Sequence, residues 1–268
     1  MVLFNYKHIM SEQISRRFIG IQRLYGQQAY QKITNSHICV IGIGGVGSWV
    51  AESLARSGVG ELTLIDLDHI SESNINRQIH ALSETLGQSK IIAMQERIVS
   101  INPGCKVNLI DDHLSCENIP EFLSANFEYI IDCIDQFRIK ACLIHYCRSN
   151  KINLLTVGGA GGRIDPTRIQ VTDLSRSEGD SLLAKTRKQL RTQHDFPRNL
   201  QRRFDIPCVF STEQLRYPTD GHEVSTNKSK CSNLSGLNCA NGFGSLSAVT
   251  ATFGMIACAH VLNKICSN

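Results

Sequence analysis

A glycine-rich loop directly follows a short apolar run near the start of the chain. Gly42-Ile43-Gly44-Gly45-Val46-Gly47 fits the pattern GxGxxG and precedes a segment with helical spacing from Ser48. Such glycines permit a tight turn and let a phosphate approach backbone N–H groups at a helix N-terminus. Asp66 follows about 20 residues later, at the end of a second apolar run, where a carboxylate can accept hydrogen bonds from ribose hydroxyls. Together these residues predict a nucleotide site, and a turn needed only for packing is the alternative.

Cationic and amide side chains follow this aspartate. Asn74-Ile75-Asn76-Arg77-Gln78 comes shortly after Asp68, and Lys90 opens the next helical pattern. Arginine and lysine stabilise charge that builds on a phosphate, whereas hydride transfer has little use for such a cluster. The cluster therefore favours ATP over a dinucleotide, although either cation alone could be a solvated surface charge. We assign phosphate contacts to Arg77 and Lys90, and further nucleotide contacts to Gly42, Gly44, Gly45, Gly47, Asp66, Asp68, Asn74 and Gln78.

A third carboxylate lies after another apolar run. Asp135 follows residues 129–132, at the edge of an open α/β sheet where ligands bind. One or two carboxylates together with nucleotide phosphates are the usual protein share of a Mg²⁺ shell. We therefore predict Asp135 as a magnesium ligand, and an aspartate in a turn or at a helix N-cap is the alternative.

The elements that must position these residues alternate between strands and helices. Such alternation predicts a doubly wound, Rossmann-like and mostly parallel α/β sheet. We treat residues 1–268 as a single domain, with a nucleotide-binding part near 30–160, a polar and mobile excursion near 175–232, and a C-terminal segment 233–268. The expected strands are 38–41, 62–65, 107–110, 129–132, 153–157 and 169–171, and the expected helices are 48–58, 88–100 and 138–148.

The site motifs together resemble the ThiF/MoeB family of adenylating enzymes, which are related to ubiquitin-activating enzymes. The resemblance is in the glycine loop 42–47, Asp66-x-Asp68, the segment 74–78, Lys90 and Asp135. It implies that Asp66 holds the ribose of ATP, that Arg77 and Lys90 contact phosphates, and that Asp135 binds Mg²⁺. It also implies a homodimer in which Arg17, with Arg23 as the competing candidate, reaches the γ-phosphate in the second subunit.

Further segments resemble a tRNA-modifying branch of that family and extend the likeness over nearly the whole chain. This resemblance implies ATP-dependent dehydration of threonylcarbamoyladenosine in tRNA, next to the anticodon, by adenylation of the substrate carboxylate. It also implies tRNA and a cysteine desulfurase system as partners, and a structural monovalent cation. The segments are Arg17-Phe18-Ile19-Gly20, Arg23-Leu24-Tyr25-Gly26, residues 76–82, 158–162, 208–213, Gly242-Phe243-Gly244 and 250–254.

Three rival functions remain open at this point. Activation of a sulfur-carrier or ubiquitin-like protein is the first, but many such relatives carry two CxxC pairs for zinc and this chain has none. We therefore expect no zinc. An NAD-dependent oxidoreductase and a non-catalytic tRNA-binding adaptor are the other two.

The composition limits the cellular setting. The chain has 268 residues, 42% of them hydrophobic, a net charge of +4 and eleven cysteines. These values fit a globular protein with a core, and the odd count leaves at least one cysteine unpaired. Burial of Cys39 and Cys133 in apolar runs would suit a reducing compartment. No secretory signal is evident, and residues 248–262 suit a buried helix better than a membrane span. We expect a cytoplasmic protein.

Two features have competing interpretations. Cys208 could attack an acyl-adenylate, but an intramolecular cyclisation needs no thiol, so we favour a packing role. The basic stretch 185–203 contains Phe196 and has the composition of a contact with nucleic-acid backbone and unpaired bases. A mobile solvated loop is the alternative for this stretch.

Overall fold

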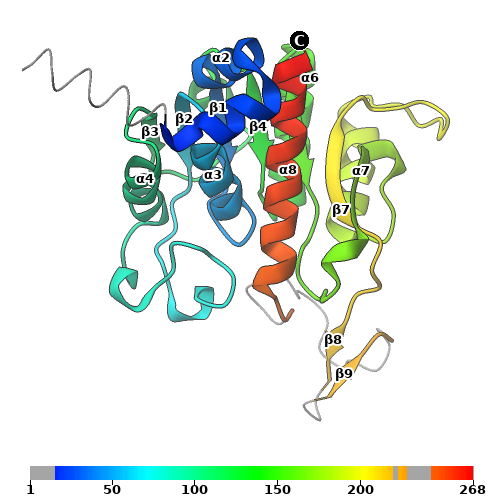
Figure 1. The fold of residues 1–268 in the computed structure, drawn as a ribbon. Coiled ribbons are helices and arrows are strands. Elements are labelled where there is room, and N and C mark those ends of the chain that lie inside the picture. Colours follow the sequence, from blue (N-terminus) through cyan, green and yellow to red (C-terminus); the bar gives the residue numbers. More distant parts are fainter. Residues whose placement is uncertain (1–15, 220–222, 228–242, 268) are drawn as a thin grey trace, which may run out of the picture.

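A seven-stranded sheet forms the centre of the molecule (Figure 1). The computed structural model describes residues 16–219, 223–227 and 243–267. The strand order is β3-β2-β1-β4-β5-β7-β6, and only β6, paired with β7, is antiparallel. The strands are β1 (His37–Ile41), β2 (Glu61–Ile65), β3 (Lys106–Ile110), β4 (Tyr129–Asp132), β5 (Leu154–Val157), β6 (Ile169–Asp173) and β7 (Pro207–Ser211).

Helices cover both faces of the sheet. Side chains alternate between the faces of a strand, so Ile38 and Val40 join one apolar cluster while Cys39 and Ile41 join the other. Residues of α2 (Gln27–Asn35), α3 (Gly47–Arg56), α4 (Lys90–Ile101) and α8 (Ser247–Ser267) belong to the first cluster. Residues of α5 (Ile119–Phe122), α6 (Phe137–Ser149) and α7 (Ser181–Gln193) belong to the second. Residues 16–25 are also helical, and β8 (Tyr217–Pro218) pairs with β9 (Val224–Ser225) in a small hairpin.

The doubly wound α/β fold predicted from the sequence is confirmed. Every expected strand and helix is present, with ends that differ by a few residues. The predicted polar excursion 175–232 is wrong for its first part, because this stretch contains α7 and the internal strand β7. Its buried apolar side chains, such as Leu183 and Leu190, are separated by charged residues, which hid the helix. The domain boundaries themselves stay a prediction.

The C-terminal helix α8 is long and apolar enough to cross a membrane by length and composition alone. Half of its most apolar window, 50%, is buried inside the protein. Phe253 and Val261 are fully buried in the first apolar cluster, and Figure 1 shows α8 lying along α3. Gly254 permits this approach, since a Cβ there would lie 3.0 Å from the Val46 carbonyl oxygen. Within this fold α8 is a core helix, as its sequence predicts.

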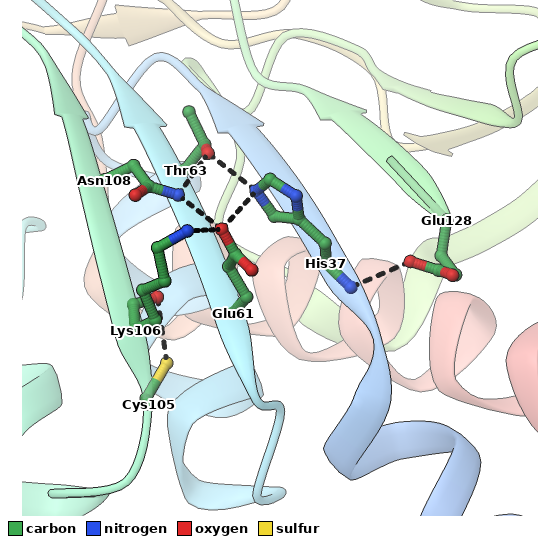
Figure 2. A network of polar contacts seen from close by, with 7 residues as sticks. All are labelled: His37, Glu61, Thr63, Cys105, Lys106, Asn108 and Glu128. Atoms are coloured by element: carbon green, nitrogen blue, oxygen red, sulfur yellow. Dashed lines mark hydrogen bonds and ion pairs between the residues drawn. The ribbon is translucent and has the colours of Figure 1, made fainter. Parts of the chain in front are cut away.

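A polar network crosses β1, β2 and β3 at their amino ends (Figure 2). The Glu61 carboxylate accepts hydrogen bonds from Lys106 at 2.7 Å and from Asn108 at 2.8 Å. His37 Nε2 lies 2.8 Å from the Thr63 hydroxyl oxygen and 3.6 Å from Glu61. Cross-strand pairs of this kind hold the register of neighbouring strands. This network is at the edge of the sheet opposite to the carboxyl ends of the strands, where the site residues lie.

A disulfide that the sequence analysis did not predict joins Cys116 to Cys142. It links the segment after β3 to α6, across 26 residues of sequence. When oxidised, it closes a loop whose restriction of the unfolded chain stabilises the fold by about 3 kcal/mol; in the reducing compartment expected from the sequence, this contribution would be lost.

Reduction of this disulfide is expected to lower the free energy of unfolding by about 3 kcal/mol, because the unfolded chain regains its loop entropy. Urea denaturation with and without dithiothreitol measures the change. A Cys142→Ser variant should start at the lower stability and respond little to dithiothreitol. An equal response of both proteins would contradict the assignment.

Candidate functional site

A cavity of about 390 Å³ opens beyond the carboxyl ends of β1 and β4. The sheet order reverses at β1, which has β2 on one side and β4 on the other. Ligands of open α/β sheets bind at such a point, because the loops of neighbouring strands diverge there. The cavity is lined by all the predicted nucleotide contacts except Gly47, together with Asp135: Gly42, Gly44, Gly45, Asp66, Asp68, Asn74, Arg77, Gln78 and Lys90.

The glycines of the first loop have different physical roles. Gly42 has φ of 85°, a left-handed conformation that favours glycine, and starts the turn after β1. Gly47 lies outside the cavity: a Cβ there would lie 1.8 Å from the Gly42 carbonyl oxygen, so glycine is needed for packing of the loop. A Cβ on Gly45 would lie 3.3 Å from the Arg77 side chain, which crosses the loop at this point. Gly44 is open toward the cavity, where a phosphate could meet its backbone.

Asp66 lines the cavity and holds the glycine loop by hydrogen bonds. Its carboxylate accepts hydrogen bonds from the backbone N–H groups of Ile43 at 2.6 Å and Asp68 at 2.8 Å. Burial raises the pKa of this carboxyl, and the nearby Lys90 partly offsets that effect. The side chain therefore joins the glycine loop to the end of β2, and its position is the one predicted for a ribose acceptor.

Lys90 is the first residue of α4, and its ammonium group lies 2.6 Å from the exposed Asp68 carboxylate. The lysine side chain is only 7% exposed, whereas that of Asp68 is 72% exposed. A buried cation with a solvated partner can exchange that partner for a phosphate at little cost, since the carboxylate stays in water. This arrangement suits a phosphate contact better than the alternative of a surface charge.

Arg77 lies on a segment held by helices on the same face of the sheet. Its carbonyl oxygen accepts hydrogen bonds from Trp49 Nε1 at 2.9 Å and from the Thr250 hydroxyl at 3.3 Å. Asn74 is 8% exposed and accepts from the Ser71 N–H at 3.1 Å, which closes the turn before Arg77. Gln78 is 5% exposed, and its side-chain oxygen has no hydrogen-bond partner among the described residues. A ligand in the cavity could donate a hydrogen bond to this oxygen.

Asp135 is exposed and lines the cavity in the loop after β4, the strand that pairs with β1. The N-cap residue of α6 is Gln136, so Asp135 is not the helix cap of the alternative interpretation. The described residues contain no group of three or more His, Cys, Asp or Glu side chains that could hold a metal ion by themselves. A single exposed carboxylate beside a phosphate site is nevertheless a normal protein share for Mg²⁺, so the donor set fits this ion.

A buried ion pair that the sequence analysis missed supports the Asp135 turn. Lys140 and Asp132 have fully buried side chains, and their charged atoms lie 2.7 Å apart. The same carboxylate accepts from the Thr156 hydroxyl at 2.6 Å and from the Ile134 N–H at 3.0 Å. Asp132 thereby joins β4, β5, α6 and the turn before Asp135. In the sequence, a lysine on the otherwise apolar face of the predicted helix could have indicated a buried ion pair.

A second missed residue, Asp180, positions the loop after β5. Its carboxylate caps α7 by accepting from the Leu183 N–H, and it accepts from the Gly159 N–H, both at 2.9 Å. A Cβ on Gly158 would lie 2.4 Å from this carboxylate, so the approach requires glycine. The segment predicted as a polar excursion therefore contributes directly to the cavity wall, through contacts that only the fold reveals.

Arg17 lies away from the cavity of its own chain. Its guanidinium donates to the carbonyl oxygens of Ser100 and Ile101, at 2.9 and 2.8 Å. These carbonyls end α4, about 16 Å along the helix from Lys90. Arg23 is exposed on the same N-terminal helix.

Cys208 lies in the core, on β7, with no exposed surface. Burial raises the pKa of its thiol to about 12, so the thiolate needed for nucleophilic attack is scarce at neutral pH. The packing role favoured for this residue agrees with its position in the second apolar cluster.

The first half of the basic stretch 185–203 belongs to α7, and its second half is a loop in which Phe196 is buried. Phe196 is 4% exposed and stacks under Arg148 at 4.5 Å, so the expectation that it stacks on bases is wrong. Its ring is instead a buried member of the second apolar cluster. Arg191 packs over Phe204 at 5.2 Å. The cations of the stretch that remain exposed are Lys185, Lys188, Arg198, Arg202 and Arg203.

The buried His80 is expected to make the free energy of unfolding depend on pH. It is 1% exposed, and burial, with smaller contributions from Lys90 and Arg97, lowers its pKa from 6.5 to about 4. Between these values the unfolded chain binds more protons than the folded one, so the free energy of unfolding falls as the pH falls below 6.5.

We expect a loss of about 2 kcal/mol from His80 between pH 7 and pH 5, at about 1.4 kcal/mol per pH unit. Urea denaturation of the wild type and a His80→Leu variant measures it. The variant should lack this part of the pH dependence. Parallel stability curves for the two proteins would show that His80 does not titrate in this way.

The fold and the cavity define an α/β nucleotide-binding protein of the doubly wound class. A family model described as ThiF family matches residues 15–268, and the chain belongs to the ThiF family. The chain is 50% identical over 256 residues, 95% of each chain, to tRNA threonylcarbamoyladenosine dehydratase of Haemophilus influenzae. The fold is similar to the crystal structure of E. coli tRNA N6-threonylcarbamoyladenosine dehydratase, TcdA, in complex with ATP. That structure has a TM-score of 0.84 and 47% identity, covering 94% of this chain and 95% of that chain. The same E. coli protein in complex with AMP gives a TM-score of 0.83 at 45% identity, with the same coverage.

Proposed function

We propose that this protein is an ATP-dependent enzyme that dehydrates threonylcarbamoyladenosine in tRNA. The observation that carries the proposal is the cavity at the strand-order reversal, which gathers a glycine loop, a ribose acceptor and two cations in one place. Relatives that cover nearly the whole chain have this activity in their names, and one of them binds both ATP and AMP. Adenylation with release of AMP accounts for both ligands.

The reaction activates a carboxylate that is otherwise a poor electrophile. A carboxylate oxygen of the substrate attacks the α-phosphate of ATP, the bond to the β-phosphate breaks, and pyrophosphate leaves. A nitrogen of the same modification then attacks the activated carbonyl, loses its proton, and expels AMP. The carboxylate oxygen leaves with AMP, so the nucleoside loses the elements of one water.

The residues of the cavity have distinct roles in this chemistry. Asp66 accepts hydrogen bonds from the ribose, while Lys90 and Arg77 stabilise the negative charge that increases on the phosphates during attack. Backbone N–H groups of the glycine loop hold the phosphates in place. The presence of these residues in the lining of one cavity supports these roles.

Asp135 is the proposed ligand of Mg²⁺, together with phosphate oxygens of ATP. When bound, the ion supplies charge neutralisation at the phosphates under attack. The Asp135 carboxylate itself holds a negative charge at the cavity wall, and the buried Asp132 fixes the turn that carries it.

The assembly is also part of the proposal. We propose a homodimer in which the Arg17 side chain gives up its hydrogen bonds to the carbonyl oxygens at the end of α4. It then contacts the γ-phosphate of the ATP bound to the partner protomer. A structural monovalent cation, a cysteine desulfurase system as partner and a cytoplasmic location complete the proposal. Sedimentation that finds only monomers at working concentrations, with full activity, would contradict the dimer.

The experiment that tests the function uses the purified protein, Mg-ATP and tRNA carrying threonylcarbamoyladenosine. Digestion and mass spectrometry are expected to show loss of one water from that nucleoside, with AMP released in equal amount. No mass change, with ATP–pyrophosphate exchange only when a small carrier protein is added, would instead support activation of a sulfur-carrier or ubiquitin-like protein.

A further inference from the structure

A second, smaller cavity of about 130 Å³ adjoins the nucleotide cavity. The two cavities share Asp135, Gly159 and Leu182 in their walls. Its remaining wall comes from the start of α6, the loop after β5, the first turns of α7, and residues Leu215 and Phe243. No residue of the glycine loop 42–47 lines this second cavity.

The walls of this second cavity combine apolar surface with positive charge. Phe137, Leu215 and Phe243 supply the apolar part. Arg163 and Lys185 are its cations, and Arg163 is buried against the Asp180 carboxylate at 3.5 Å. Lys185 is exposed and forms no ion pair within the described part of the chain, and its ammonium lies 5.9 Å from the Phe137 ring centroid. The charge of Lys185 is therefore available to an anionic ligand.

The proposed reaction needs a cation at this position. The substrate carboxylate and the triphosphate are both negative, so their approach is opposed electrostatically. A carboxylate in the second cavity would also lie against the apolar side chains of Phe137, Leu215 and Phe243, where a charge is costly unless a cation binds it. Lys185 is placed to do so, because it belongs to the wall that Asp135 also belongs to.

We propose that the second cavity binds the carboxylate-bearing acyl arm of the modified adenosine, with the carboxylate against the Lys185 ammonium. This inference rests on the proposed function. The cavity is smaller than the roughly 300 to 1,000 Å³ of sites that enclose drug-sized ligands, so it suits the acyl arm rather than a whole nucleoside. Lys185 is then a specificity-determining residue that recognises the carboxylate before adenylation.

A binding experiment with two matched tRNAs tests this inference. One tRNA carries threonylcarbamoyladenosine, and the other carries the same modification with its carboxylate converted to an amide. Binding of each to wild-type, Lys185→Gln and Lys188→Gln proteins is measured in the presence of a non-hydrolysable ATP analogue. Lys188 is a lysine on the same helix that does not line the cavity, so it controls for general attraction of tRNA.

The wild type is expected to prefer the carboxylate tRNA by about 10-fold, the size of one charge-assisted hydrogen bond. Lys185→Gln should remove that preference by weakening the carboxylate tRNA alone, whereas Lys188→Gln should leave the preference intact. Equal weakening of both tRNAs by Lys185→Gln would show that this lysine contacts the tRNA backbone, and would overturn the inference. Absence of any preference in the wild type would also overturn it.

The mass assay on the wild type separates this inference from the proposed function. Water loss in the wild type together with an unchanged carboxylate preference in Lys185→Gln would leave the function in place and overturn the role of Lys185. Absence of water loss in the wild type would contradict the function itself.

Discussion

Replacement of Asp135 by alanine is expected to lower the rate of AMP release with modified tRNA by about 10³-fold, the size of losing one electrostatic contributor to a transition state. The carboxylate lines the cavity and is exposed, so its removal leaves no buried group without a partner. The folded structure should therefore persist, with a melting temperature close to that of the wild type. Single-turnover measurements of AMP at several Mg²⁺ concentrations follow the effect.

Asp111→Ala is the matched control for this variant. Asp111 is also an exposed aspartate just after a strand, β3, but it does not line the cavity. Its replacement should leave AMP release and the Mg²⁺ dependence unchanged. Wild-type turnover in Asp135→Ala, with an unchanged Mg²⁺ dependence, would rule out Asp135 as the metal ligand.

Replacement of Lys140 by methionine should lower the free energy of unfolding by about 3 to 5 kcal/mol, the cost of leaving a buried charge without its partner. The variant keeps the aliphatic volume of the side chain but leaves the fully buried Asp132 carboxylate with only neutral donors. Urea denaturation at pH 7 measures the loss. We also expect weaker nucleotide binding, because Asp132 holds the turn that carries Asp135.

A double variant, Lys140→Met with Asp132→Asn, separates the charge from the packing. The asparagine oxygen can still accept a hydrogen bond from the Ile134 N–H, and its NH2 group can donate to the Thr156 hydroxyl oxygen, while no buried charge remains. Removing both members of a buried pair is usually far less costly than removing one. The double variant should therefore recover more than half of the lost stability, and equal stability of the single and double variants would show that the ion pair is not the cause.

The burial of the strands between the two apolar clusters explains why six strands of the sheet could be predicted from the sequence. It also shows why the seventh, β7, could not. Strands such as β1 and β4 are short, continuous apolar runs, since helices bury both of their faces. β7 is also buried, but it follows a charged segment whose helix α7 has only three buried positions. Local patterning does not reveal a strand that returns to the sheet interior after such a segment, because its neighbours β5 and β6 are distant in sequence.

The sequence by itself determined the nucleotide loop, the order of the strands up to β5 with the helices α3, α4 and α6 between them, and side chains around the cavity, including Asp66, Lys90 and Asp135. These features depend on residue types within one βα unit or at the end of one strand, so they are local. The tertiary structure alone decided the Asp132–Lys140 pair, the contact of Asp180 with Gly159, and the second cavity beside Lys185. Each of these brings together residues from different elements, and such pairing depends on how helices pack on the sheet rather than on any pattern along the chain.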